Sequence, residues 1–402
     1  MAYKTHHSVV VIGGGNGGVS IAARLRREGV EDIAIIEPRS QHYYKPLFSH
    51  VGGGTARRST TVRSQASVTP KGVDWVRDAV VSIHPGENAV VLGKGTRHTY
   101  DHVVVCPGIQ QNWEAVPGLV DALATDAVAS HYDFDLVPKT SQLLHDLTHG
   151  TVVFVQPPGP SSCAGAAQKP MYQACDYWRA TGVLADIRVV MVVPDPSIFG
   201  LDHIDRELER VIAEYGIEVR TSTALREVDG GSRVITLGAV EGTGESEQLH
   251  YDVLNVVPPQ SAPDWLKGSD LAAADDDGGF VEVDTRTLRH PRYPNVWAIG
   301  DAAATTNSKS GGALRDQAFA LAKNLTSVMR GGRPTELYDG YSVCPFTVSR
   351  STVVFAEFDD QGNAEPTIPF WKSMYRENRV SWIFDRHILP WVYWNLILKG
   401  RA

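Results

Sequence analysis

The sequence predicts an α/β fold with two three-layer domains, each built on a mainly parallel sheet, followed by a C-terminal amphipathic segment. Apolar, β-branched runs at 8–12, 33–36, 151–155 and 187–193 are typical of buried parallel strands. Stretches with helical spacing of apolar residues lie between such runs, and this alternation indicates strand–helix–strand units. Residues 371–402 differ from the rest because they are rich in tryptophan and positive charge.

Length and composition exclude several classes of protein. A chain of 402 residues has room for two or three domains at about 150 residues each. Hydrophobic residues make up 43% and charged residues 21%, as in a folded globular protein. The formal net charge of −8 disfavours nucleic-acid binding, which depends on Lys and Arg at phosphates. The sequence has no apolar stretch long enough for a bilayer-spanning helix, so we expect none. It shows no secretory leader and has only four cysteines, so we expect a reducing, cytoplasmic location.

A glycine-rich turn follows the first expected strand. The pattern G-x-G-x-x-G is met by Gly13, Gly15 and Gly18. The first glycine allows the tight turn, the second lets the backbone approach a pyrophosphate, and the third allows close packing of helix on strand. The second strand, at 33–36, ends at Glu37, where an acid accepts hydrogen bonds from a ribose. This context predicts a Rossmann-like dinucleotide-binding domain; a glycine-rich turn without a ligand is the alternative.

Two later strand ends extend the site. A strand expected at 100–105 ends in a turn at Gly108, and another at 293–299 ends at Gly300 and Asp301. These segments resemble the second and third fingerprints of flavoproteins with two dinucleotide-binding domains. The resemblance implies that Asp301 holds the ribityl chain of FAD. A helix N-cap is a second role for this carboxylate, and it is compatible with the first.

The second expected domain lacks a phosphate-binding fingerprint. After the strand at 151–155 the chain has Pro157 and Pro158 where glycines would be needed, and proline has no backbone N–H to donate to a pyrophosphate. We therefore expect a Rossmann-like domain that does not bind NAD(P)H. The further expected elements are an edge strand at 74–81, helices at 166–180 and 202–215, and strands at 187–193 and 217–219.

Two of the four cysteines are candidates for redox chemistry. Cys163 lies at an expected helix start, where the helix dipole favours a thiolate, and Cys344 lies in a loop-like stretch before Pro345. They are 181 residues apart and the chain has no C-x-x-C, so we expect no metal site. From the residues alone, redox and structural roles both stay open for this pair. Cys175 lies in the middle of an expected helix and Cys106 at the end of an expected buried strand, so both are expected to be structural.

Over nearly its whole length the sequence resembles the sulfide:quinone oxidoreductases, of the type that includes the mitochondrial enzymes. The segments that carry the resemblance are His42–Pro46, Cys163–Tyr172, Pro258–Pro259, Thr287–His290, Asn307–Lys309, Tyr338–Pro345 and Ala356–Asp359. The resemblance implies that Cys163 and Cys344 are a redox pair and that FAD is held without a covalent bond. The implied FAD contacts are Gly15, Asn16, Glu37, Lys45, Val80, Asp301, Lys309 and Gly311.

Lys309 has two interpretations. A cation beside the flavin ring stabilises its anionic reduced form. A surface lysine in a Gly/Ser loop is the alternative, and the resemblance favours the flavin.

The composition of the C-terminal segment predicts that it contacts a membrane surface. It contains Trp371, Trp382, Trp391 and Trp394, and six positive residues against two negative ones. Pro390 interrupts the expected helix, which is too short to span a bilayer. Helices that are aromatic, apolar and flanked by basic residues lie in the membrane interface. A pair of helices that caps the core, or a contact in a homo-oligomer, is the alternative.

These observations predict a peripheral membrane enzyme that oxidises sulfide to sulfane sulfur and passes two electrons through FAD to a membrane quinone. Sulfide, sulfite, cyanide or a thiol would accept the sulfane sulfur. We expect an FAD domain over 1–110 and 285–335, a second Rossmann-like domain over 111–284, and a C-terminal segment over 336–402. The alternatives are a type II NADH:quinone dehydrogenase, a flavocytochrome-type sulfide dehydrogenase and a flavin-bound redox sensor. The missing second fingerprint argues against the first, and the absence of C-x-x-C-H and of a leader argues against the second.

Overall fold

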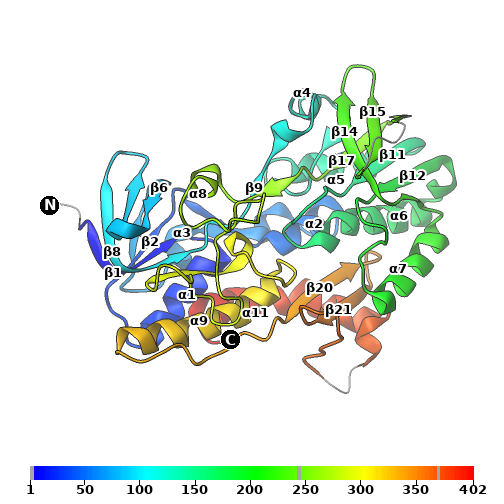
Figure 1. Ribbon diagram of the computed structural model, residues 1–402. Coiled ribbons are helices and arrows are strands. Elements are labelled where there is room, and N and C mark those ends of the chain that lie inside the picture. The colour runs from blue at the N-terminus through cyan, green and yellow to red at the C-terminus, as the bar shows by residue number, and fades with distance from the viewer. Residues whose placement is uncertain (1–3, 242–245, 369–371) are drawn as a thin grey trace.

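The computed structural model describes residues 4–241, 246–368 and 372–402, so Trp371 lies outside the described residues. Two large sheets lie at opposite ends of the molecule (Figure 1). The first sheet has the order β5-β2-β1-β8-β7-β6, and β19 also pairs with β8. Its strands are β1 (His6–Ile12), β2 (Ile33–Ile36), β5 (Asp74–Val76), β6 (Val80–His84), β7 (Ala89–Leu92), β8 (Arg97–Val105) and β19 (Val296–Ala298).

Helices cover one face of the first sheet. Helices α1 (Asn16–Arg27) and α9 (Gly311–Met329) bury Ile21 and Leu321 against the strands. The pairings of β1 with β2 and β8, of β2 with β5, and of β8 with β19 are all parallel. In a parallel sheet the carboxyl ends of the strands share one edge, so the turns after β1, β2, β8 and β19 meet there.

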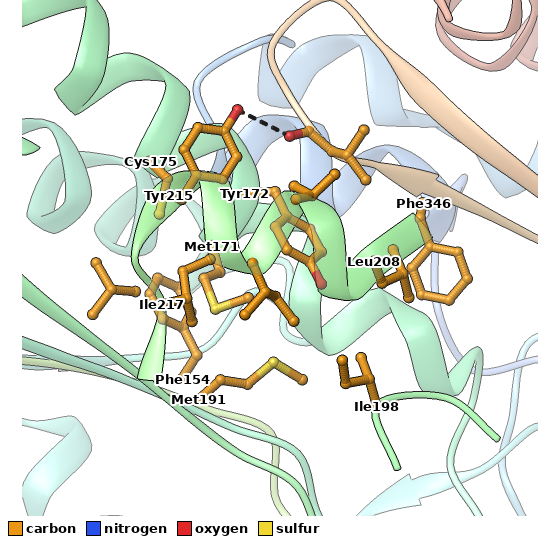
Figure 2. Packing of buried hydrophobic residues seen from close by; sticks show 14 of the residues in the cluster. Phe154, Met171, Tyr172, Cys175, Met191, Ile198, Leu208, Tyr215, Ile217 and Phe346 are labelled. Atoms are coloured by element: carbon orange, nitrogen blue, oxygen red, sulfur yellow. Dashed lines mark hydrogen bonds between the residues drawn. The ribbon is translucent and has the colours of Figure 1, made fainter. Parts of the chain in front are cut away.

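The second sheet is parallel throughout, with the order β10-β17-β11-β12-β13. Its strands are β10 (Val128–Ala129), β11 (Gly150–Val155), β12 (Ile187–Val192), β13 (Glu218–Arg220) and β17 (Val253–Val256). Helices α6 (Lys169–Thr181) and α7 (Asp202–Tyr215) pack on one face, where Met171 and Tyr172 meet Phe154 and Met191 (Figure 2). The other face is covered by the antiparallel sheet β14 (Thr223–Asp229), β15 (Val234–Ala239) and β16 (Glu247–His250).

A hairpin from late in the chain joins the second core. Strands β20 (Ser342–Thr347) and β21 (Val353–Phe358) are antiparallel, and Phe346 is buried in the same cluster as Tyr172 (Figure 2). The hairpin therefore carries Cys344 to the side of α6.

The smaller elements connect these layers. They are β3 (Gln41–Tyr43), β4 (Val62–Ser64), β9 (Gln110–Gln111), β18 (Gln260–Ser261), α2 (Phe48–Gly52), α3 (Gln65–Val68), α4 (Leu119–Leu123), α5 (Val137–Asp146) and α8 (Asp264–Lys267).

The C-terminal segment is a chain of short helices docked on the first half of the molecule. Helix α10 (Arg379–Ile383), a π-helical turn (Phe384–Ile388) and α11 (Leu389–Asn395) follow one another. Pro390 lies in the first turn of α11, where its missing N–H costs little. Tyr393 and Trp394 are buried in a cluster with Val19 of α1. Among the described residues, no helix has the length and apolar character needed to cross a bilayer.

Two sequence predictions about strands were wrong. The edge strand expected at 74–81 is two strands, β5 and β6, which lie at opposite ends of the strand order. The chain turns at 77–79, where Asp78 accepts from the N–H of Ala79. Cys344 lies in strand β20 rather than in a loop. Pro345 is tolerated there because a two-stranded sheet leaves one edge of each strand unpaired.

Candidate active site

The glycine turn after β1 is closely packed where the fingerprint requires glycine. Gly13 has φ +102°, and a Cβ there would lie 2.4 Å from the carbonyl oxygen of Cys106. A Cβ on Gly18 would lie 1.7 Å from the carbonyl oxygen of Gly13. Gly15 caps α1 without a side-chain hydrogen bond, and the position of its Cβ is open space. The first N–H groups of α1 are thus left to bind an anion.

The predicted ribose acid lies beside this turn. Glu37 Oε2 accepts a 2.8 Å hydrogen bond from the N–H of Gly14, and Oε1 accepts one of 2.8 Å from the N–H of Arg39. These two bonds fix the carboxylate next to the glycine turn. Trp75 on β5 donates to the carbonyl oxygen of Glu37, which fixes the backbone as well.

Further predicted residues converge on the same edge of the sheet. Gly300 has φ +70° and donates to Gln317 on α9 over 2.8 Å, which places Asp301 in the turn after β19. The electrostatic neighbours of Lys45 include both Asp301 and Glu37. Gly108, φ +80°, has open space at its Cβ position.

The remaining predicted cofactor contacts lie around this group. Val80, at the start of β6, is buried in an apolar cluster with Ile12 and Ile36, the last residues of β1 and β2. A Cβ on Gly311 would lie 3.9 Å from Nδ2 of Asn16, so the starts of α9 and α1 face each other.

Lys309 is buried rather than on the surface, so the surface alternative is wrong. Its Nζ donates a 2.8 Å hydrogen bond to the carbonyl oxygen of Ala303 and lies 4.0 Å from the ring centre of Phe280. Burial lowers the pKa of the ammonium group, and the charge of Asp301 opposes that effect. A buried cation and Asp301 therefore share this end of the site.

The structure brings the two candidate cysteines together. The Sγ atoms of Cys163 and Cys344 are 3.6 Å apart, and both residues are free thiols. The N–H of Cys163 donates to the carbonyl oxygen of Lys309 over 2.7 Å. A Cβ on Gly165 would lie 2.7 Å from the Cys344 sulfur, so only glycine leaves room for the pair. The sulfur atoms thus lie where the two halves of the molecule meet the Lys309 segment.

The two sulfur atoms have opposite tendencies to ionise. The pKa of Cys163 is lowered to about 6, first by a hydrogen bond from Cys344 and then by the charge of Lys169, against the effect of burial. The pKa of Cys344 is raised, because its thiol donates that bond and is itself buried. Such a pair holds one nucleophilic thiolate and one neutral thiol.

The predicted cause of Cys163 reactivity needs correction. We expected the thiol at the start of an α-helix, but Cys163 precedes a 3₁₀ turn (Ala164–Gln168), and α6 begins at Lys169. Cys163 has φ +52°, which is uncommon for a residue with a side chain. Its sulfur is activated by neighbouring side chains rather than by the end of a long helix.

The residues present fit FAD. The glycine turn leaves a cradle that a side chain at Gly15 would fill, and the Glu37 carboxylate is fixed beside it, where an acid can accept from a ribose. The charges of Asp301 and buried Lys309 lie toward the cysteines. Among the described residues, no group of three or more His, Cys, Asp or Glu is arranged to hold a metal ion.

Comparison with known proteins agrees with this geometry. The model of the pyridine nucleotide-disulphide oxidoreductase family matches residues 7–324. The mitochondrial sulfide:quinone oxidoreductase of Mus musculus is 35% identical over 398 residues, which is 99% of this chain and 87% of the relative. The chain belongs to the sulfide:quinone oxidoreductase family. The Dictyostelium discoideum member is 34% identical, again over 99% of this chain and 87% of its own length.

The fold of the family is also found among solved structures. The crystal structure of the sulfide:quinone oxidoreductase of Aquifex aeolicus superposes with a TM-score of 0.82 at 20% identity, covering 99% of this chain and 92% of that one. At this identity the likeness shows the fold alone.

Sequence reasoning missed three residues that surround the cysteines. Tyr132 donates to the carbonyl oxygens of Ser162 and Cys163, at 2.9 and 3.1 Å. Gly165 leaves room for Cys344, and Lys169 places its ammonium group beside Cys163. Gly165 and Lys169 lie in the Cys163–Tyr172 segment that carries the family resemblance, but nothing marks Tyr132 in the sequence. Cys106 and Cys175 are buried in cores, as expected of structural residues.

Proposed function

We propose that this chain oxidises sulfide to sulfane sulfur through Cys163 and Cys344 and passes two electrons by way of FAD to a membrane quinone. The observation that carries the proposal is the 3.6 Å approach of two sulfur atoms from distant segments, beside Lys309. Oxidation of this pair to a disulfide needs only a small movement, because an S–S bond is about 2.05 Å long.

The cysteines perform the sulfur chemistry. Hydrosulfide attacks the Cys344 sulfur of the disulfide, the S–S bond breaks, Cys344 becomes a persulfide and Cys163 leaves as a thiolate. The lowered pKa of Cys163 makes it the better leaving group of the two. An acceptor then takes the outer sulfur from Cys344, and the disulfide re-forms as two electrons leave the pair. Bound FAD accepts these electrons and supplies the route to the quinone.

Residues of the first sheet would hold the FAD. The proposed contacts are Gly13, Gly15, Asn16, Gly18, Glu37, Lys45, Val80, Gly108, Gly300, Asp301, Lys309 and Gly311. The proposed limits of the FAD domain, 1–110 and 285–335, follow from the strands and turns that carry these residues.

The finer partners are also proposals. Sulfide, sulfite, cyanide or a thiol would accept the sulfane sulfur, and the segment after 371 would contact the membrane surface that holds the quinone. Val380, Ile383, Ile388 and Trp391 are exposed there, which supports contact with lipid. A cytoplasmic location and a homo-oligomer stay predictions; the relatives named above as mitochondrial act in another compartment.

Anaerobic absorbance of the purified protein tests the proposal. Sulfide should bleach the flavin band at about 450 nm, NADH should not, and a short-chain quinone should restore the band. Bleaching by NADH alone would favour the type II NADH dehydrogenase, against which Pro157 and Pro158 argue because they remove two backbone donors after β11. Flavin that sulfide does not reduce would favour the redox sensor.

A further inference from the structure

Lys169 is placed beside the redox pair by the turn that follows Cys163. The 3₁₀ turn Ala164–Gln168 leads into α6, and Lys169 is the first residue of that helix. Its Nζ lies 3.8 Å from the Cys163 sulfur, and the residue is 5% exposed. This sulfur is the one side-chain partner of the ammonium group among the described residues. A buried cation without a carboxylate at hydrogen-bond distance is costly unless an anion forms beside it.

The other charges near this pair are few. Cys344 on β20 faces both Cys163 and Lys169, Asp301 acts on Cys163, and Asp385 of the π-helical turn acts on Lys169 from farther away. His131 lies close to Lys169, but burial lowers its pKa to about 4, so it is neutral at neutral pH.

Two further groups complete the surroundings. The phenol of Tyr132 is neutral as well, since burial raises its pKa. Burial works to lower the pKa of Lys169, yet the negative charge of the Cys163 sulfur opposes burial, and the pKa lies above its ordinary value. Lys169 is therefore a charged partner of the Cys163 sulfur, at 3.8 Å.

We infer that Lys169 is a further catalytic residue, which holds the Cys163 sulfur as a thiolate each time the sulfur bridge opens. When hydrosulfide attacks Cys344, one S–S bond forms and one breaks, and the negative charge of the attacking ion moves to Cys163. The Lys169 ammonium group, 3.8 Å from the Cys163 sulfur, stabilises that negative charge. Its significance for turnover rests on the proposed function, but the charge pairing itself does not.

The test is site-resolved alkylation of the reduced, FAD-loaded protein with iodoacetamide as a function of pH, with the Cys163 peptide followed by mass spectrometry. The thiolate reacts, so the rate follows ionisation of the thiol. The parent should show a midpoint near pH 6. In Lys169→Met the midpoint should rise by about one unit or more, which makes alkylation close to tenfold slower at pH below the parent midpoint. Lys169→Arg, which keeps a positive charge, should retain most of the parent behaviour.

Lys323→Met is the matched control, because Lys323 pairs with Glu28 on the surface of α9 far from this turn in the sequence. Its midpoint should equal that of the parent. An unchanged midpoint in Lys169→Met would overturn the inference, as would a slowing that is uniform over all pH, since that indicates restricted access. The assay uses neither sulfide turnover nor quinone, so failure of the proposed function is seen separately, in the bleaching experiment.

Discussion

The backbone N–H of Cys163 donates a hydrogen bond to the carbonyl oxygen of Lys309 over 2.7 Å. This bond joins the turn that follows β11 of the second sheet to the segment that precedes α9. The Lys309 ammonium group donates to the carbonyl oxygen of Ala303. Lys309 therefore holds the Cys163 turn through its backbone and places a buried positive charge through its side chain. Cys163 keeps a left-handed conformation in this arrangement, which costs roughly 1–2 kcal/mol. The loop is therefore held in place by its surroundings, with the sulfur fixed toward Cys344.

Replacing either sulfur of the pair should abolish turnover. Cys163→Ser and Cys344→Ser should each lower sulfide-dependent quinone reduction by at least about 10³-fold, because the pair acts as a unit. Flavin content should stay at the parent level. Cys175→Ala is the control: it should keep the activity and lose about 1 kcal/mol of stability from a buried core position. A Cys344→Ser protein with the parent rate would contradict the mechanism.

Substitutions at two glycines of the fingerprint should have different effects, one on protein stability and the other on FAD binding. Gly18→Ala places a methyl group against the carbonyl oxygen of Gly13, so we expect a loss of roughly 1–3 kcal/mol in stability together with the flavin. Gly15→Ala meets open space at φ −74° and should fold normally, while FAD affinity falls at least about tenfold because the methyl group occupies the approach to the pyrophosphate.

The exposed Gly86→Ala, which also meets open space, is the control and should change neither property. The measurements are thermal unfolding and the ratio of flavin to protein after dialysis. Equal FAD retention by Gly15→Ala and the parent would count against a pyrophosphate at this turn.

The alternation of strands and helices could be read from the sequence because local patterns carry it. Helix α7 begins and ends where the spacing of apolar residues predicts, at Asp202 and Tyr215. The run at 74–81 did not reveal its break, because β-branched residues continue on both sides of the turn. Cys344 was misplaced because Pro345 indicates a loop, whereas the free edge of a two-stranded sheet accepts proline.

The parts of the site that depend on tertiary packing could not be predicted from local patterns. The prediction that Cys163 and Cys344 form a pair came from the family resemblance, because no local sequence pattern relates two residues 181 positions apart. The contact of Lys169 with Cys163 depends on a 3₁₀ turn, and an α-helix starting at Cys163 would place the ammonium group elsewhere.

An ion pair between Asp176 and Arg350 should stabilise the geometry of the cysteines. Asp176 on α6 accepts from Nε and N–H of Arg350, in the turn of the hairpin that carries Cys344, at 3.1 and 3.2 Å. Burial works to raise the pKa of Asp176, but the hydrogen bonds from Arg350 hold it below its usual value. A lowered carboxyl pKa contributes stability above the unfolded value, and this is lost as pH falls through the folded value.

Asp176→Asn should therefore lower the free energy of unfolding by about 1 kcal/mol at pH 7, and the difference should shrink as pH falls below about 4. Denaturant unfolding at several pH values measures it. Exposed Asp186, whose carboxylate has no hydrogen bond or ion pair within the described residues, supplies the control Asp186→Asn, with no expected change. A difference that stays constant from pH 7 to pH 3 would show that charge is not the cause.

The C-terminal segment should bind lipid through the side of its helices that faces away from the protein. Trp391 is 58% exposed and Ile388 is 43% exposed. Tyr393 and Trp394 of the same segment are buried in the cluster that contains Val19. Trp391→Ser combined with Ile388→Ser should lower binding to phosphatidylserine vesicles by at least about tenfold, since each apolar side chain that enters the interface contributes on the order of 1–2 kcal/mol. Vesicle co-sedimentation at low and high salt measures the loss.

Activity with a short-chain, water-soluble quinone should stay at the parent level in that double variant, because neither residue contacts the cysteines. Val120→Ser is the matched control: Val120 is 50% exposed on α4, away from the C-terminal segment, and its loss should not affect vesicle binding. If the double variant bound vesicles as tightly as the parent, the exposed residues would instead suit a contact between copies of the chain. Sedimentation velocity of the parent and double variant would then reveal a change in oligomeric state, because burial of two large apolar side chains in such a contact contributes several kcal/mol.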